Sequence, residues 1–151
     1  MCCRLGWPQM AEMDERRKDV YQMFQWAVQA LVQPPEIQRA LFPSWVVVAD
    51  ELALDFYHLW EAFEDHFGDS LSREQREAIK ALDDLLDEMS GPGKPELWTD
   101  EGCLNHPKWW EVRRLAADVL RVFGWPLEVP PIGRTIYAQY KEDGTGEIWP
   151  P

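Results

Sequence analysis

Apolar residues recur at three- and four-residue steps in four stretches of the chain, with polar residues between them. This spacing places the apolar side chains on one face of an α-helix, so each stretch predicts an amphipathic helix. The first stretch stops at Pro34-Pro35, because proline lacks a backbone donor and restricts the residue before it. Ser72 and Gln75 form the sequence signature of a capping box at the start of the third. The predicted helices cover residues 11–33, about 43–67, about 72–89 and 107–124.

The remaining segments lack helical spacing. The pattern predicts a short turn over residues 35–42 and a long loop over residues 91–106. After the fourth helix the sequence is rich in proline, which indicates an extended tail, and the turn-forming run EDGTGE is compatible with a small terminal β-hairpin. The expected fold is all-α: a compact bundle of about four main helices with an irregular proline-rich C-terminal tail. We expect one domain over residues 1–151, with residues 1–10 open to disorder and residues 125–151 extended.

Composition narrows the class of protein. The 151 residues are 46% hydrophobic and include nine Trp, which is enough to build a core and is not a disordered composition. No run approaches the eighteen apolar residues of a membrane span, and the N-terminus lacks the basic-then-apolar pattern of a signal peptide. Three cysteines do not make a disulfide framework. We therefore expect a cytoplasmic protein without a membrane partner.

The negative charge is concentrated in one region. Residues 50–101 contain 16 Asp and Glu but 4 Lys and Arg, which accounts for the whole net charge of −12. A field of this sign repels nucleic acid and anionic membranes and attracts cations or basic proteins. We therefore expect no nucleic-acid partner. The acids of this region are the residues to test, first for chemistry and then for binding.

Asp55 and His58 stand three residues apart on the second predicted helix, which is the acid–histidine spacing of di-metal helical bundles. Such a site needs a second pair and further carboxylates, and the other predicted helices offer none. A surface pair is therefore the preferred interpretation. Cys103 and His106 lack a third group to orient the histidine, and neighbouring acids disfavour a thiolate nucleophile. With no phosphate-binding loop or dinucleotide fingerprint, we expect no catalytic residues and no cofactor.

One alternative comes from a resemblance to an enzyme family. Glu61 and Glu64, followed by Asp84 and Asp87, are similar in spacing to the paired acids of all-α nucleoside-triphosphate pyrophosphohydrolases of the MazG and dUTPase type. The resemblance implies that these four carboxylates hold Mg²⁺, although the family usually has Glu where Asp84 stands. At about 100° per residue, Glu61 and Asp84 point away from the apolar stripes of their helices. A metal cage between packed helices needs inward acids.

A binding surface is the preferred interpretation of the acids. On the second helix, apolar residues such as Leu54 stand among acids on the face opposite the core, as in an interface with a charged rim. On the third, acids repeat at four-residue spacing, which costs the helix roughly 0.2–0.5 kcal/mol per like-charge pair and concentrates negative potential. Trp98, in the following loop, is a candidate to enter a partner's pocket. The expected partner-binding residues are Asp50, Glu51, Leu54, His58, Glu61, Asp65, Asp83, Asp84, Asp87, Glu88 and Trp98.

In general character the chain resembles the immunity proteins of bacterial toxin systems, which bind a cognate toxin, often a basic nuclease, and block its active site. The resemblance rests on small size and on the acidic and aromatic stretches DELALDFYHLWEAFED, ALDDLLDE and ELWTDEG. It implies a non-enzymatic inhibitor of a basic protein, whose carboxylates replace substrate phosphates or pair with catalytic Lys and Arg. An adaptor or structural domain without a toxin connection is the other alternative.

Overall fold

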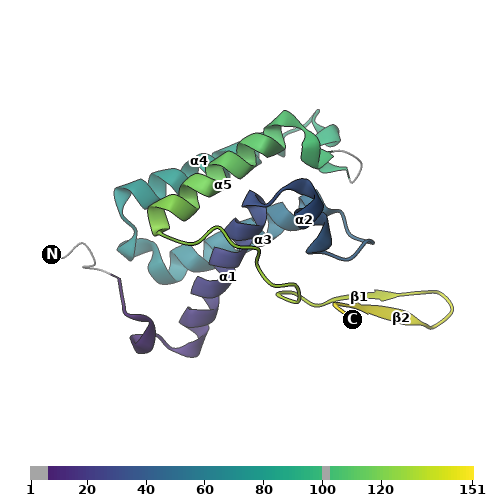
Figure 1. The fold of residues 1–151 in the computed structure, drawn as a ribbon, viewed down its shortest axis with the longest axis horizontal. Helices are drawn as coiled ribbons and strands as arrows, with labels where there is room; N and C mark the ends of the chain where they lie inside the picture. Colours follow the sequence, from purple (N-terminus) through teal and green to yellow (C-terminus); the bar gives the residue numbers. More distant parts are fainter. Residues whose placement is uncertain (1–6, 100–102) are drawn as a thin grey trace.

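Four long helices form the body of the described chain, which comprises residues 7–99 and 103–151 of a computed structural model (Figure 1). α1 lies between α3 and α5, and α5 also packs along α4, so the apolar stripes of the helices meet in one core. The prediction of an all-α bundle with about four main helices is confirmed. The long helices are α1 (Glu15–Val32), α3 (Val48–Phe67), α4 (Arg73–Met89) and α5 (Pro107–Phe123).

The ends of these helices follow from local sequence. Asp14 caps α1 by accepting a hydrogen bond from the Arg17 amide at 2.8 Å. The predicted capping box of α4 is present, because the Ser72 hydroxyl accepts from the Gln75 amide and the Gln75 side chain accepts from the Ser72 amide. α5 ends at Phe123 and is capped by Gly124, whose positive φ of 69° suits a residue without a side chain.

Two segments before α3 differ from the sequence-based expectation. The predicted short turn over residues 35–42 contains a helix, α2 (Pro35–Ala40), which begins with proline where the missing donor is harmless. α3 begins at Val48 and not near Pro43, because Val47 is extended and consecutive β-branched valines disfavour a helical start. The helix that carries most of the expected binding residues is therefore shorter at its N-terminal end than the pattern predicts.

Short 3₁₀ turns occupy several of the remaining connections. One of them precedes α1, so the first long helix begins after its Asp14 cap and not at residue 11. Another joins α3 to α4 closely enough to make the two helices run in opposite directions. The turns are η1 (Met10–Glu12), η2 (Gly68–Ser70), η3 (Pro95–Trp98) and η4 (Cys103–Asn105).

The core is dominated by aromatic rings. Phe24 of α1 stacks on Phe63 of α3 with ring centroids 4.5 Å apart, and both rings are fully buried. Trp109 brings a third large, fully buried side chain from α5. Each such residue stabilises the fold by about 1.5–3 kcal/mol. Of residues 1–10, the first six lie outside the described residues, and Trp7 packs against this aromatic cluster.

A buried arginine ties α5 to the corner between α1 and α2. Arg113 is 4% exposed, its Nε donates to the Gln33 carbonyl at 2.9 Å, and Nη2 donates to the Gln38 side-chain oxygen at 2.6 Å. The guanidinium also lies over the Trp110 ring, 4.3 Å from its centroid. Burial is the main cause that lowers the Arg113 pKa to about 10, so the group stays charged at neutral pH. This cation therefore joins helices and is not part of the acidic region.

The C-terminal segment crosses the bundle and ends in a hairpin. Gln29 of α1 and Gln33, the residue directly after α1, donate side-chain hydrogen bonds to the carbonyls of Pro126 and Glu128, both at 2.9 Å. These bonds fix the proline-rich stretch against the helices. The hairpin that the sequence allows is present and reaches beyond the helices in Figure 1. Its antiparallel strands are β1 (Tyr137–Tyr140) and β2 (Gly146–Trp149).

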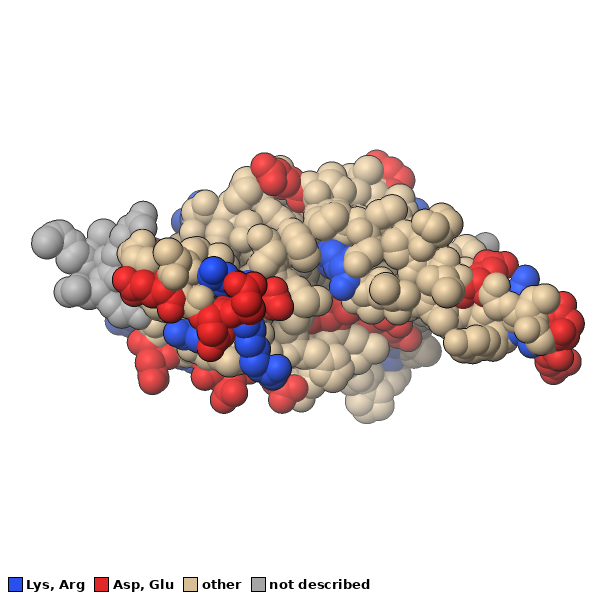
Figure 2. Space-filling view, turned by 90° about the horizontal axis from the view of Figure 1, so that it is seen from below, with Lys and Arg blue, Asp and Glu red and all other residues tan. Residues whose placement is uncertain are grey.

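The surface is unevenly charged. Figure 2 shows one face on which charged side chains gather at the left end and at the tip of the hairpin on the right, while the broad middle is mostly uncharged but also contains basic and acidic side chains. Within the described part of the chain, no helix combines the length and the apolar character that a membrane span requires.

Several large apolar side chains of the C-terminal segment are exposed: Leu127, Val129, Ile132, Ile136, Tyr140 and Ile148.

Candidate functional site

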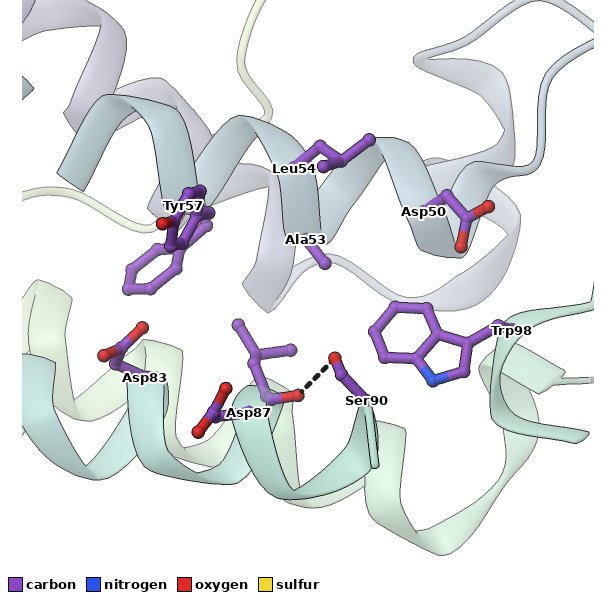
Figure 3. A pocket seen from close by; sticks show the side chains of 10 residues that line it. Asp50, Ala53, Leu54, Tyr57, Asp83, Asp87, Ser90 and Trp98 are labelled. Atoms are coloured by element: carbon purple, nitrogen blue, oxygen red, sulfur yellow. Dashed lines mark hydrogen bonds between the residues drawn. The ribbon is translucent and has the colours of Figure 1, made fainter. Parts of the chain in front are cut away.

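A groove runs between α3 and α4, two helices that together carry 12 of the 27 Asp and Glu residues of the chain (Figure 3). α1 packs against α3, and α5 packs against α4, but α3 and α4 leave a cavity of about 510 Å³ between them. Because the two helices are antiparallel, the first half of α3 faces the second half of α4. Side chains from both helices and from η3 therefore line one groove.

The floor of the groove is apolar. Phe56 of α3 and Leu86 of α4 are buried residues whose side chains also border the cavity, and Ala53 of α3 points toward α4 between them (Figure 3). Leu54 and Tyr57 stand along the α3 edge and are 47% and 52% exposed. A partner that covered this floor would remove apolar surface from water, which is worth about 25 cal/mol per Å².

Three carboxylates surround this floor. Asp83 and Asp87 lie one turn apart on α4, and Asp50 lies in the first turn of α3 toward the other end (Figure 3). Among the described residues, no Lys or Arg forms an ion pair with Asp83 or Asp87. Burial raises the pKa of Asp83, and the charges of Asp84 and Asp87 raise it further. The groove thus holds negative charge that an outside cation can neutralise.

Trp98 closes one end of the groove. Its Nε1 donates to the Met89 carbonyl at 2.8 Å, and its ring meets Trp109 edge-on with centroids 5.5 Å apart. The sequence predicts a loop ring that enters a partner's pocket, whereas in the structure the ring is held against the end of α4. Trp98 is therefore placed to form a wall of the groove, next to Ser90 (Figure 3).

A second flank of α3 is covered by the C-terminal segment. The Tyr137 hydroxyl donates to the Glu51 carboxylate at 3.0 Å, and the largely buried Arg134 pairs with Asp55 at 4.0 Å. Burial raises the pKa of Asp55 to about 6, although Arg134 acts to lower it. Burial and the Asp55 charge also raise the pKa of Tyr137, so its hydroxyl remains a donor. Glu51, an expected binding residue, is thus engaged within the chain.

The other expected binding residues lie outside the groove. Asp84 forms an ion pair with Lys80 at 2.7 Å. The Glu88 carboxylate is 3.8 Å from the Lys94 ammonium and 3.6 Å from that of Lys108. The charges of Asp84 and Glu88 are therefore both neutralised in part by neighbouring cations. A separate depression along α3 is lined in part by His58, Glu61 and Asp65.

The structure therefore brings some of the expected binding residues together in the groove and adds lining residues that the sequence analysis did not propose. Sequence reasoning does not identify Phe56 or Leu86, because both belong to core stripes, and a helical projection cannot show that a core residue also faces a gap between two helices. Tyr57 is signalled by its place beside the outward acids of the second predicted helix. Of the eleven expected binding residues, those in the groove are Asp50, Leu54, Asp83, Asp87 and Trp98.

The four carboxylates of the Mg²⁺ alternative are not brought together. Asp87 lines the groove, whereas Glu61 and Glu64 line the separate depression. Glu64 pairs with Arg76 at 2.8 Å, and Asp84 pairs with a lysine. Within residues 7–99 and 103–151, no three His, Cys, Asp or Glu side chains are grouped closely enough to hold a metal ion. The described geometry therefore provides no ligand set for the pyrophosphohydrolase resemblance.

Comparisons with known proteins give no relative for this chain. No protein-family model matches it, no curated protein sequence matches it, and no solved structure matches its fold. The resemblance to immunity proteins therefore stays a prediction from the sequence. What the protein does has to follow from the geometry and the charge of the groove.

Proposed function

We propose that this protein is a non-enzymatic binding protein that takes a basic segment of another protein into the groove between α3 and α4. One observation carries the proposal: an apolar floor with exposed edges lies beside carboxylates, two of which have no ion pair among the described residues. Water solvates the carboxylates well, but contact between water and the apolar floor is unfavourable in free energy. A basic partner would cover the floor and neutralise the carboxylates together.

The charge around the groove supports the same proposal. The acidic excess lies within residues 50–101, which include both walls of the groove. Such a field speeds the encounter with a positive partner and loses strength as salt rises, because the screening length is about 8 Å at physiological ionic strength. We therefore expect association with the partner to be faster at low salt.

The partner that we propose is a toxin, in the manner of immunity proteins. A nuclease holds the phosphates of its substrate with Lys and Arg side chains. Spaced carboxylates such as Asp83 and Asp87 offer the same side chains a substitute for phosphate. An inhibitor of this kind acts where the nucleic acids of the host lie, so the cytoplasm is the proposed compartment.

Affinity capture from the organism that encodes the chain tests the proposal. The immobilised protein is used to capture partners, which are identified by mass spectrometry, and the capture is repeated with the Asp83→Lys/Asp87→Lys variant. We expect a basic protein whose affinity falls about 100-fold in the variant, equivalent to about 2.7 kcal/mol. Expression of the captured protein alone should be toxic to host cells, and co-expression with the wild-type chain should relieve that toxicity.

Glu61→Lys/Asp65→Lys is the matched control, because it makes the same change of charge on α3 outside the groove. The control variant should keep most of the affinity. If both variants weaken capture equally, net charge and not the groove determines binding, and the proposed site is wrong. If the captured protein is harmless to the host, the inhibitor role is wrong, even where the groove binds it.

A further inference from the structure

We infer that the occupant of the groove is an amphipathic α-helix with basic residues on both sides of its apolar stripe. The inference rests on the proposed function and adds the secondary structure and the residue pattern of the partner segment. Three features of the groove lead to it: helical walls, the spacing of the acids and the length of the apolar floor.

Both walls of the groove are helices. An extended peptide usually binds by adding a strand to an exposed sheet edge, and the only sheet of the described residues, the β1–β2 hairpin, does not line the groove. A groove between two helices instead accepts a third helix, whose side chains enter between the ridges of its neighbours. Ala53 keeps the middle of the α3 wall low, which lets another backbone approach closely.

The acids match the repeat of a helix. Asp83 and Asp87 are four residues apart on α4, which separates their Cβ atoms by about 5–6 Å. Basic residues one turn apart on the occupant have nearly the same separation, because a helix rises about 5.4 Å per turn. Asp50 lies on the opposite wall, toward the Trp98 end (Figure 3). Carboxylates on both walls therefore present negative charge to both sides of the apolar stripe, which favours an occupant with Lys or Arg on both sides.

The length of the groove sets the number of anchors. The lining residues run from Asp50 to Tyr57 on one wall and from Asp83 to Ser90 on the other. Seven helical steps correspond to about 10 Å, or two turns of an occupant. Two turns present three apolar side chains on one face, at spacings of three or four residues. The occupant should therefore insert about three large apolar anchors.

The charge of the groove selects against a second copy of this chain. The protein carries a net charge of −12, so two copies repel one another before their apolar surfaces can meet. Within the groove, burial and like-charged neighbours raise the pKa of Asp83, and a cation placed beside it would relieve that repulsion. A basic helix from another protein fits both observations.

Two synthetic peptides of identical Leu and Lys composition test the inference. One repeats Leu at steps of three and four residues, and the other alternates Leu with Lys in a strand pattern. We expect the first to bind at least about tenfold more tightly in calorimetry, a difference of about 1.4 kcal/mol. When isotope-labelled, it should show helical NMR shifts in the complex. The Leu54→Asp variant should weaken its binding by a similar factor, and since Leu54 is 47% exposed the variant should still fold.

Each other outcome overturns the inference. Equal binding of the two peptides would show that charge alone is recognised, and absence of binding by the helical peptide would show that the groove takes no helix. Sedimentation that reveals self-association, lost in Leu54→Asp, would identify a second copy as the occupant. None of these peptide results tests the proposed function, which depends on the capture experiment. The proposed function is wrong if the Asp83→Lys/Asp87→Lys variant and the Glu61→Lys/Asp65→Lys control capture the partner equally well.

Discussion

α3 has two acidic flanks, and the chain treats them differently. On one flank, Asp55 and Glu51 meet Arg134 and Tyr137, which the C-terminal segment brings from far along the sequence. On the other flank, toward α4, the acids border a groove whose apolar edge stays exposed. Both flanks combine carboxylates with large apolar side chains. The covered flank binds a segment that supplies a cation and a hydroxyl group, from Arg134 and Tyr137. The open flank offers a partner a similar combination of carboxylates and apolar side chains.

The covered flank also shows the cost of burying such acids. The pKa of Asp55 is raised to about 6 even though Arg134 lies beside it, because burial penalises the carboxylate more than the guanidinium stabilises it. Burial also lowers the pKa of Arg134, whose side chain is 7% exposed. A partner that binds in the groove should meet a smaller desolvation penalty, because the carboxylates at the rim of the groove are less buried than Asp55. The following experiments test this contrast.

Removal of the cation from the covered flank should have the largest effect. Arg134→Met leaves Asp55 without its partner, and the loss of one member of a buried ion pair costs roughly 3–5 kcal/mol. Urea unfolding at pH 8 measures the loss, which should shrink at pH 5 as Asp55 takes up a proton. The double variant Asp55→Asn/Arg134→Met should recover much of the stability. A single variant as stable as the wild type at pH 8 would show that the ion pair does not hold the C-terminal segment.

The titration of Asp55 should give the next largest effect. Its pKa is about 6 in the folded protein against 3.8 in the unfolded chain, so the folded state holds the proton more tightly. The resulting stabilisation is full below about pH 4 and is lost as the pH rises through 6, a change of about 3 kcal/mol. The free energy of unfolding of the wild type, minus that of Asp55→Asn, should therefore fall by most of this amount between pH 4 and pH 7.5. A difference that does not vary with pH would contradict the perturbed pKa.

A smaller effect is expected from the hydroxyl on the same flank. Tyr137→Phe removes the hydrogen bond to Glu51 and should lower the free energy of unfolding by about 1 kcal/mol. Because the substitution lies outside the groove, the affinity for the helical Leu and Lys peptide should not change. Calorimetry and urea unfolding on the same variant measure both quantities. A loss of peptide affinity would mean that the two flanks are coupled.

The smallest effect on stability should come from the open flank, and with the opposite sign. Asp83→Asn/Asp87→Asn relieves a like-charge pair on α4 and should raise the free energy of unfolding by about 0.2–0.5 kcal/mol. The same variant should bind the helical peptide more weakly, since it lacks the rim charges. Asp84→Asn on the same helix is the control: it loses its pairing with Lys80 and should not gain stability. Lower stability in the groove variant would show that these acids are structural.

Much of the fold can be predicted because its determinants are local. The capping box at Ser72 and the glycine that ends α5 are read directly from neighbouring residues, and the hairpin follows from one turn sequence. The start of α3 is the clearest error, because the helical pattern continues through Val47 while the backbone there is extended. The concentration of acids in the middle of the chain is likewise a property of the sequence and needs no structure.

The neighbours of those acids are decided only in three dimensions. Asp50 and Glu51 are adjacent and chemically alike, yet one lines the groove and the other accepts a hydrogen bond from Tyr137, 86 residues away. Helical periodicity fixes the angle between two such side chains at about 100°. It does not fix which segment each one faces, because that depends on how distant helices pack. The long helices and their charge therefore follow from the sequence. The position of the groove follows from tertiary packing, because the C-terminal segment covers one flank of α3 and leaves the flank toward α4 open.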